Sequence, residues 1–357
     1  MKKQTVLSLI ALLLLSLFSL AEEPLPVFPP PLRPGDTIAV VAPASDLNRE
    51  RVERAVGRLE AMGFRVKWAS DIYRKRGYLA GTDERRADEL MAAFRDPEVK
   101  AIFPGTGGYG TTRMIDRLDY ETIRRHPKIL HGFSDVTGLH LAIQKKTGLV
   151  TFHGPNLMYG LGSEGNLTSF SAEYLWRALL ERNYFDSQGR PVSPGYSYTA
   201  PDDVTPMITI SPGVARGRLI GGNLSLISPL IGSEFEIETQ GRILFIEDVG
   251  EKPYRIDRYL SHLRLAGKLD DVAGVVLGIF RNCEPEDPED SLSLEQVFRD
   301  YFEDLGVPVI LNFPIGHFKY NATLPVGVLA ELDADRRRLT LLENPVQLAP
   351  AIPVDPR

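Results

Sequence analysis

The sequence predicts an α/β fold, with a doubly wound, mostly parallel sheet in an N-terminal domain and a second α/β domain after it. Short β-rich apolar runs alternate with segments of helical spacing, as βαβ units require. Residues 184–213 are rich in Pro, Gly, Ser and Asp, a composition typical of a crossing between domains. The length of 357 residues suits one large or two medium domains.

The first half supplies the alternation. Apolar runs predict strands at residues 37–42, 64–69, 99–103 and 150–153. The spacing of apolar residues predicts helices at 48–62, 82–94 and 111–118. Between the last two strands, ILHGFSDVTGLHLAI (129–143) begins with apolar residues, bends at Gly132–Asp135 and ends in a helical pattern. This half therefore reads as a parallel sheet with crossover helices.

The second half repeats the pattern beyond the crossing. Strands are predicted at 215–220, 242–247, 272–279 and 309–311, and helices at 255–265 and 294–305. Residues 328–342 alternate in short pieces and predict a closing hairpin around Asp333-Ala334-Asp335. The predicted organisation is a signal peptide (1–21), an N-terminal domain (22–183), a linker (184–213) and a C-terminal domain (214–357).

The first residues have the form of a secretory signal peptide. Lys2 and Lys3 precede an apolar run from Val6 to Leu20, and the run ends in Ser19-Leu20-Ala21, with small residues at the cleavage site. A retained membrane anchor is the alternative, but the run is short for a span of about 20 residues. We expect cleavage after Ala21 and a periplasmic or otherwise exported protein, with no further membrane span.

Composition excludes several classes of function. A net charge of −6 argues against a nucleic-acid partner. The single cysteine, Cys283, excludes an internal disulfide, and its acidic neighbours disfavour a reactive thiolate. Neither HExxH nor paired Cys/His spacing occurs, so we expect no metal and no cofactor.

The bend at Ser134 admits two readings. A serine on a strand-to-helix elbow has an exposed hydroxyl, beside the N–H of the next residue and a helix N-terminus. Alternatively, Ser134 or Asp135 only caps the helix, since Val136 stands where the G-x-S-x-G pattern has its last glycine. The glycines of 105–110 are weak evidence for a dinucleotide site; they fit a flexible turn or a second oxyanion donor.

A serine nucleophile needs a base and an orienting acid. Of six histidines, His317 is favoured because it follows a predicted strand and a Pro-Gly turn, and open α/β sheets place their sites at strand ends. His131 and His153 fall in predicted strands, as core histidines with satisfied hydrogen bonds. Glu247 ends another buried strand and completes the order Ser, acid, His; salt bridging by the acidic pair at 247–248 is the alternative.

Six blocks in one order resemble the LD-carboxypeptidase family of serine peptidases, also called muramoyltetrapeptide carboxypeptidases, to which microcin-cleaving immunity peptidases are similar. The resemblance runs from about Pro34 to Leu342. The blocks are GGYG with a following Arg (107–113), GFSDVTGLH (132–140), FHGPN (152–156), GRLIGGNLSLISPLIGS (217–233), LFIEDVGEKPYRIDRYL (244–260) and NFPIGH (312–317).

The resemblance implies an active site between the two domains. Ser134 matches the family's nucleophile, in the N-terminal domain, while Glu247 and His317 match its acid and base, in the C-terminal domain. One departure is Thr106, which stands where an arginine commonly precedes the paired glycines.

The resemblance also implies binding groups. The backbone N–H of Asp135, with that of Gly108 from the Gly107-Gly108 pair, would form an oxyanion hole. Asn156 and Asn223 fall in blocks near the cleft and would hold the substrate.

The activity implied is that of a serine LD-carboxypeptidase, which releases terminal D-alanine from murein tetrapeptides through an acyl-enzyme. Cell-wall recycling and a homodimer are implied with it. One alternative is a related peptidase that cleaves a peptide-nucleotide antibiotic or another acylated amine. The other is a non-catalytic exported peptide-binding protein, which would give Glu247 and His317 no shared purpose.

Overall fold

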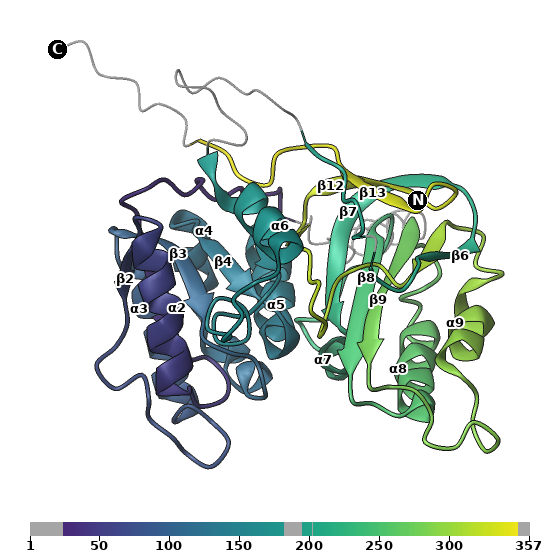
Figure 1. Cartoon of the computed structure of the whole chain (residues 1–357), viewed down its shortest axis with the longest axis horizontal. Coiled ribbons are helices and arrows are strands. Elements are labelled where there is room, and N and C mark those ends of the chain that lie inside the picture. The colour runs from purple at the N-terminus through teal and green to yellow at the C-terminus, as the bar shows by residue number, and fades with distance from the viewer. Residues whose placement is uncertain (1–23, 182–194, 202, 349–357) are drawn as a thin grey trace, which may run out of the picture.

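Two lobes, each built on its own sheet, lie side by side in the computed structural model (Figure 1). The structure describes residues 24–181, 195–201 and 203–348. The predicted signal peptide (1–21) and residues 184–194 of the predicted linker lie outside the described residues.

The N-terminal lobe holds a six-stranded sheet of order β11-β5-β4-β3-β1-β2, in which the first five strands of the chain run parallel. The strands are β1 (Thr37–Val41), β2 (Arg65–Lys67), β3 (Val99–Pro104), β4 (Ile129–Gly132), β5 (Thr151–His153) and β11 (Leu324–Val326). The helices are α2 (Arg49–Ala61), α3 (Asp83–Arg95), α4 (Tyr120–Arg125), α5 (Thr137–Thr147) and α6 (Ser169–Leu179). Side chains of Asn48 and Thr82 cap α2 and α3 at the predicted starts.

The C-terminal lobe holds a seven-stranded sheet of order β13-β12-β7-β8-β9-β10-β6, whose four central strands β7 to β10 run parallel. The strands are β6 (Ile208–Ser211), β7 (Val214–Asn223), β8 (Ile243–Val249), β9 (Gly274–Arg281), β10 (Val309–Leu311), β12 (Leu329–Asp333) and β13 (Arg338–Leu341). The helices are α7 (Leu224–Ile227), α8 (Pro253–Leu265) and α9 (Leu294–Phe302), the last with a capping box of Ser293 and Gln296. The predicted closing hairpin is confirmed as β12 and β13.

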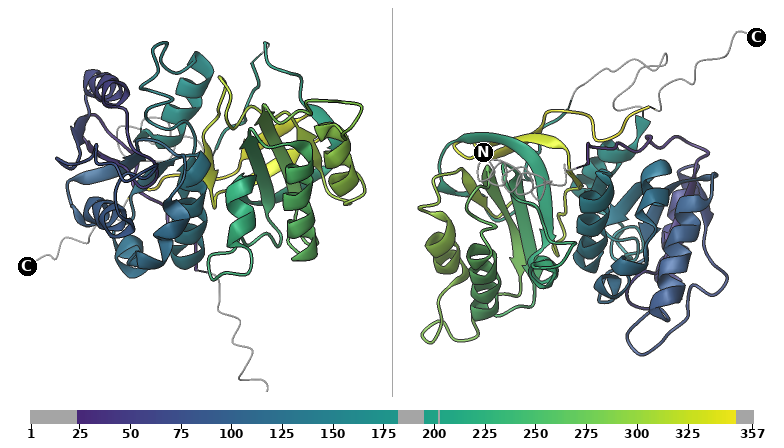
Figure 2. Two further views of the ribbon diagram at one scale, coloured as in Figure 1. Left: turned by 90° about the horizontal axis from the view of Figure 1, so that it is seen from below. Right: turned by 180° about the vertical axis from the view of Figure 1, so that it is seen from behind.

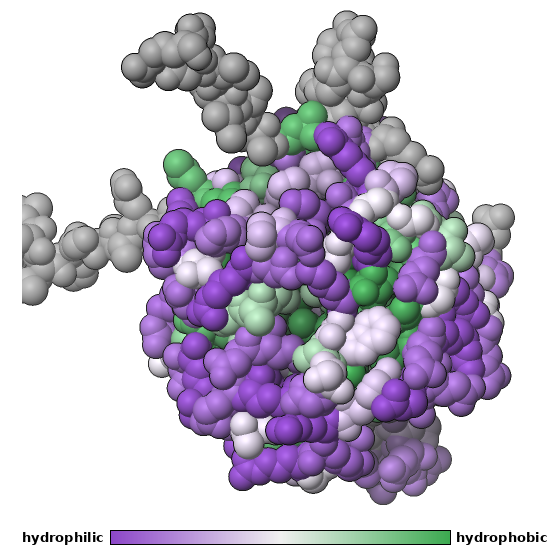
Figure 3. Space-filling model, turned by 90° about the vertical axis from the view of Figure 1, so that its left-hand side faces the viewer, coloured by the Kyte–Doolittle hydropathy of each residue, from purple (hydrophilic) through white to green (hydrophobic). Residues whose placement is uncertain are grey.

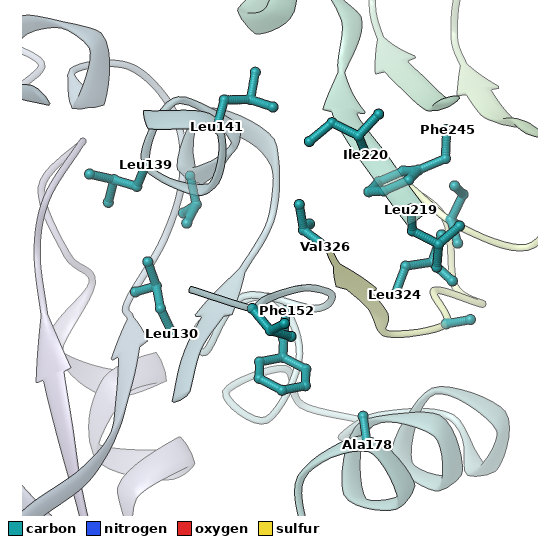
Figure 4. Packing of buried hydrophobic residues seen from close by; sticks show 14 of the residues in the cluster. Leu130, Leu139, Leu141, Phe152, Ala178, Leu219, Ile220, Phe245, Leu324 and Val326 are labelled. Atoms are coloured by element: carbon teal, nitrogen blue, oxygen red, sulfur yellow. The ribbon is translucent and has the colours of Figure 1, made fainter. Parts of the chain in front are cut away.

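A strand from the end of the chain joins the two lobes. β11 pairs antiparallel with β5 at the edge of the N-terminal sheet, and the chain then continues into β12 of the other sheet. Leu324 and Val326 on β11 lie between Phe152 of the first sheet and Leu219 of the second (Figure 4). The buried hydrophobic residues of both lobes therefore form one continuous core.

The predicted mostly parallel α/β architecture is confirmed, and several details were wrong. Residues 111–118 form two short 3₁₀ turns, Thr111–Arg113 and Ile115–Arg117, instead of one helix. The predicted linker contains β6, which pairs with β10. Helices α4 and α6 and strand β11 were not predicted. β11 contains Pro325, a residue that argues against a strand in any but an edge position.

The outer face of the N-terminal lobe is mostly hydrophilic, with smaller hydrophobic patches (Figure 3). Views from below and behind show the same two lobes in contact along one side (Figure 2).

Within residues 24–181, 195–201 and 203–348, no helix has the length and hydrophobicity that a bilayer span requires.

Candidate active site

A pocket of about 840 Å³ opens between the lobes. Its N-terminal side includes Gly107 and Ser134, which follow β3 and β4. Its C-terminal side includes Arg281, at the end of β9, and His317, after β10. The parallel strands of both sheets thus direct their carboxyl ends toward one pocket, the position that open α/β sheets use for their sites.

Ser134 occupies a strained turn between β4 and α5. Its φ is +64°, in the left-handed region that residues other than Gly, Asn and Asp seldom adopt. The side chain of Asn156 holds the preceding residue: its Oδ1 accepts a hydrogen bond from the Phe133 N–H at 2.9 Å, and its Nδ2 donates to the Phe133 carbonyl at 3.3 Å. Such strain persists only where the surroundings fix it, as they do here, and it lifts the hydroxyl into the pocket.

Ser134, His317 and Glu247 form a hydrogen-bonded chain across the two lobes. His317 Nδ1 lies 2.7 Å from Glu247 Oε2, and His317 Nε2 lies 3.0 Å from Ser134 Oγ. A carboxylate can only accept, so Nδ1 carries the proton, and Nε2 is left to accept the hydrogen bond of the serine hydroxyl. Three residues spread over 183 positions of the chain therefore meet in the arrangement of a nucleophile, a base and an orienting acid.

The charge environment favours a protonated His317. Burial, the largest single effect, lowers the pKa of its imidazole, but the charge and hydrogen bond of Glu247 together with the charge of Asp248 outweigh burial, and the net pKa is raised above 6.5. Asp248 lies beside Glu247 on the same strand, and burial together with the Glu247 charge raises the pKa of Asp248 to about 7. Glu247 therefore orients His317, Asp248 accepts hydrogen bonds from Asn223 and Ser225, and among the described residues neither acid forms a salt bridge to α8.

The glycine loop after β3 lies directly against the elbow. A Cβ added to Gly107 would come within 2.9 Å of the Ser134 Cβ and 3.1 Å of the Asp135 nitrogen, so only glycine fits there. Gly108 has a φ of +96°. Gly108 lines the pocket together with Ser134, and among the described residues neither its N–H nor that of Asp135 donates a backbone hydrogen bond outside the helices and strands.

Asp135 and Ser45 fix this loop. The buried Asp135 carboxylate accepts a hydrogen bond from the Thr111 N–H at 2.8 Å, and the Thr111 hydroxyl donates to the Asp135 carbonyl at 2.5 Å. On the other side, the Ser45 hydroxyl accepts a hydrogen bond from the Tyr109 N–H at 3.2 Å, and the Ser45 N–H donates to the Gly107 carbonyl. Elbow and glycine loop are thereby held as one unit.

The two asparagines predicted to hold the substrate are already engaged with the protein. Asn156 lines the pocket, but it braces the elbow through both atoms of its carboxamide. Asn223 is not among the residues that line the pocket: its Nδ2 donates to Asp248 at 3.1 Å, and its Oδ1 accepts from Ser225 at 2.6 Å. Its backbone N–H also donates to Thr137 at the start of α5, so Asn223 joins the two lobes. Block position alone could not distinguish these supporting contacts from substrate contacts.

Three of the other five histidines are not available as bases. His131, His140 and His153 are buried, and burial lowers the pKa of His131 to about 3, that of His140 to about 4 and that of His153 well below 6.5. His140 Nε2 donates to the Gly132 carbonyl at 2.8 Å. The expectation of satisfied hydrogen bonds was wrong for His131 and His153, because their ring nitrogens have no partner among the described residues.

The chain's single thiol and the possible metal ligands among its described residues also add no reactive group to the site. Cys283 is fully buried, and burial raises the pKa of its thiol to about 11. In the described part of the chain, no group of three or more His, Cys, Asp or Glu side chains is placed to hold a metal ion.

Three residues around the pocket were missed at the level of sequence: Ser45, Asp248 as a support, and Arg281. Each lies at or just after the carboxyl end of a parallel strand, β1, β8 and β9 respectively. That position was the available signal, because sites in open α/β sheets gather there. Their use in the pocket depends on which strands are neighbours, and the sequence alone does not give that order.

Comparisons with known proteins find relatives that match both lobes of this chain. Residues 38–154 match the model of the LD-carboxypeptidase N-terminal domain, and residues 216–332 match that of the LD-carboxypeptidase C-terminal domain. A probable murein peptide carboxypeptidase of Bacillus subtilis is 42% identical over 305 residues, covering 85% of this chain and 91% of the relative.

Solved structures are similar over nearly the whole chain. A muramoyltetrapeptide carboxypeptidase from Oxalobacter formigenes has a TM-score of 0.74 at 28% identity, covering 87% of this chain and all of the other. The structure of MccF in complex with glutamyl sulfamoyl guanosine has a TM-score of 0.81 at 27% identity, covering 90% of this chain and all of the other.

Proposed function

Because the chain belongs to the LD-carboxypeptidase family and is therefore a serine peptidase, we propose that it releases terminal D-alanine from murein tetrapeptides. The bond cleaved is the amide between an L-configured centre, such as that of diaminopimelate, and the D-alanine nitrogen. Membership of a peptidase family sets aside the alternative of a non-catalytic binding protein.

Acylation uses the three hydrogen-bonded side chains. Ser134 Oγ attacks the scissile carbonyl carbon while His317 Nε2 accepts the hydroxyl proton. Glu247 holds the Nδ1–H tautomer and stabilises the imidazolium that forms. The tetrahedral intermediate collapses as His317 gives its proton to the leaving nitrogen, so the C–N bond breaks and D-alanine departs with a neutral amine.

The oxyanion of this intermediate lies between the N–H groups of Gly108 and Asp135. Removing one such donor typically costs about 3 kcal/mol in barrier height. Water then attacks the acyl-enzyme with His317 as its base, and the carboxylate product leaves as the proton returns to Ser134 Oγ. Both half-reactions thus use the same base and the same donors.

The observation that carries the proposal is the Ser134–His317–Glu247 hydrogen-bonded chain inside a pocket of the family's fold. Purified protein is incubated with a muropeptide tetrapeptide, and free D-alanine is measured. The proposal predicts release by the wild type and at least a thousandfold less by Ser134→Ala, since the triad members act as a unit. Equal release by both proteins, or none by the wild type, contradicts it.

A related substrate class is the second candidate. It is favoured by the similarity to MccF, whose solved complex holds glutamyl sulfamoyl guanosine, an amino acid linked to a nucleoside. The catalytic steps would be unchanged and only the leaving group would differ. Comparing kcat/KM for a murein tetrapeptide and an aminoacyl sulfamoyl nucleoside decides between the two.

Export and dimerisation belong to the same proposal. Export is supported by the basic start and apolar run of residues 1–21, and a homodimer by the family resemblance. Exported protein should have its N-terminus at Glu22, as N-terminal sequencing of periplasmic material would report. Light scattering on the purified protein should give twice the chain mass.

A further inference from the structure

We propose that Arg281 binds the terminal carboxylate of the peptide and so makes this site a carboxypeptidase site. The assignment rests on the proposed function, because it names the group that recognises the leaving D-alanine.

Arg281 stands beside the base, at the end of β9. Its backbone carbonyl accepts a hydrogen bond from the Gly250 N–H at 2.9 Å, which ties it to the loop after β8. Its Nη1 donates to the His317 carbonyl at 3.4 Å, and its side chain lines the pocket. The same sheet edge therefore supplies Glu247, His317 and this guanidinium.

Charge pairing leaves Arg281 as the available cation of the pocket. Of the other charged residues in the pocket lining, Lys319 pairs with Asp203 at 2.9 Å, and Asp46 pairs with Lys75 at 3.0 Å. Arg281 pairs with no carboxylate among the described residues. A guanidinium has five N–H donors, and the long contact to His317 uses one of them.

The reaction dictates where the terminal carboxylate must lie. In D-alanine, one carbon separates the amine nitrogen from the carboxylate, so the carboxylate oxygens lie roughly 3 Å from the leaving nitrogen. His317 must protonate that nitrogen, so the carboxylate comes to rest next to His317, on the leaving-group side. Arg281 lies beside His317 in the pocket lining, and its planar fork matches a carboxylate through two parallel hydrogen bonds.

Such a contact explains selectivity for the last residue of a peptide. A chain that continued beyond the scissile bond would place a neutral amide against Arg281 and forfeit the charge-assisted hydrogen bonds. Hydrogen bonds to charged groups are about twice as strong as neutral ones, so a charged anchor discriminates between the two substrates.

The test compares two substrates in each protein. Formation of the tripeptide product is measured with the tetrapeptide acid and with the same tetrapeptide carrying a terminal carboxamide. The wild type should prefer the acid by roughly 10- to 100-fold in kcat/KM. In Arg281→Gln, kcat/KM for the acid should fall by that factor, whereas kcat/KM for the carboxamide should change little. The ratio of the two values should therefore approach one. Arg281→Lys keeps the positive charge but lacks the planar guanidinium, so its ratio should lie between those of the wild type and Arg281→Gln.

The ratio separates binding from indirect effects. Removing Arg281 also raises the pKa of His317, because the guanidinium lowers it, but that change affects both substrates equally within one protein. Lys319→Gln is the matched control, a second cation in the pocket lining already paired with Asp203, and it should keep the wild-type preference.

The outcomes distinguish the two proposals. If the wild type cleaves neither peptide, the proposed function fails, and this assignment fails with it. If the wild type cleaves the acid and Arg281→Gln keeps the wild-type ratio, or Lys319→Gln loses it, only the role of Arg281 is overturned.

Discussion

His317 has to satisfy two opposing demands, and its surroundings set the balance at the scale of a single residue. As a base it must be neutral in the free enzyme, whereas the Glu247 carboxylate at 2.7 Å stabilises its charged form. The result is a pKa raised above 6.5 despite burial. The same carboxylate that orients the ring therefore restricts the pH range in which the ring can act.

This predicts the acid limb of the pH profile. Activity should rise as the pH increases through the pKa of His317, with an inflection in kcat/KM above 6.5, because only neutral His317 accepts the serine proton. Glu247→Gln removes the largest cause that raises this pKa, so its inflection should move to lower pH while kcat falls. Initial rates from about pH 5 to about pH 9 measure both effects.

Glu251→Gln is the matched control, an acid on the next loop that pairs with Arg255 instead of His317. Its inflection should equal that of the wild type. An unchanged inflection in Glu247→Gln would mean that another group sets the profile.

The sequence could predict which residues form the centre of the site and not how the others are used. Ser134, Glu247 and His317 carry chemical types and strand-end positions that mark them without knowledge of the fold. Asn156, Asn223 and Arg281 differ in this respect. Whether an asparagine contacts substrate or a backbone amide depends on side-chain directions across two sheets, as the Phe133 contacts of Asn156 show.

At the scale of an element, the elbow stores strain. Ser134 has a positive φ between β4 and α5, which costs about 1 to 2 kcal/mol for a residue with a Cβ. The Asn156 bridge, the Asp135–Thr111 contacts and the close approach of Gly107 hold it there. The protein thus gives up some stability to keep the hydroxyl in the pocket.

A pair of substitutions measures that strain. Both Ser134→Ala and Ser134→Gly remove the hydroxyl, but only glycine adopts a positive φ without steric cost. Ser134→Gly should therefore be the more stable variant by about 1 kcal/mol in the free energy of urea unfolding. Ser171 in α6 is the control: there glycine should be less stable than alanine by about 1 kcal/mol. Equal stabilities at position 134 would argue that the elbow is relaxed.

Most of the long elements with a strong local signal were predicted, although helix α6 was missed, and the short strands defined by distant partners were not predicted. Strands buried on both faces read as nearly continuous apolar runs, which is why β1 and β8 were found. β6 and β11 are three or four residues long and exist because β10 and β5 offer them an edge. Residues 111–118 have helical spacing, yet the Asp135 contacts to Thr111 turn the chain there into two short 3₁₀ turns.

At the scale of the whole molecule, the site depends on two sheets that share a core. Ser134 belongs to one lobe, and its base and acid belong to the other, so the 3.0 Å contact between Ser134 and His317 requires the lobes to stay in register. β11 and the contact of Asn223 with Thr137 provide that connection.

Shared packing predicts a single unfolding transition. Both tryptophans, Trp68 and Trp176, lie in the N-terminal lobe, so their fluorescence reports on that lobe, while far-ultraviolet circular dichroism reports on both. The two urea curves should coincide. Leu324→Ala truncates a buried side chain on β11, and it should lower the free energy of unfolding measured from both curves by about 2 to 5 kcal/mol. Leu265→Ala changes an exposed side chain and should leave the free energy of unfolding near that of the wild type. Separate transitions would show lobes that fold independently.

The account rests on Ser134 as a nucleophile activated from across the cleft, and covalent labelling tests that most directly. The protein is treated with a fluorophosphonate, and the intact mass and the labelled peptide are determined. We predict one adduct per chain on the peptide that contains Ser134, no adduct in Ser134→Ala, and labelling at least a hundredfold slower in His317→Ala. An adduct on another residue, or a rate unaffected by the loss of His317, would contradict the account.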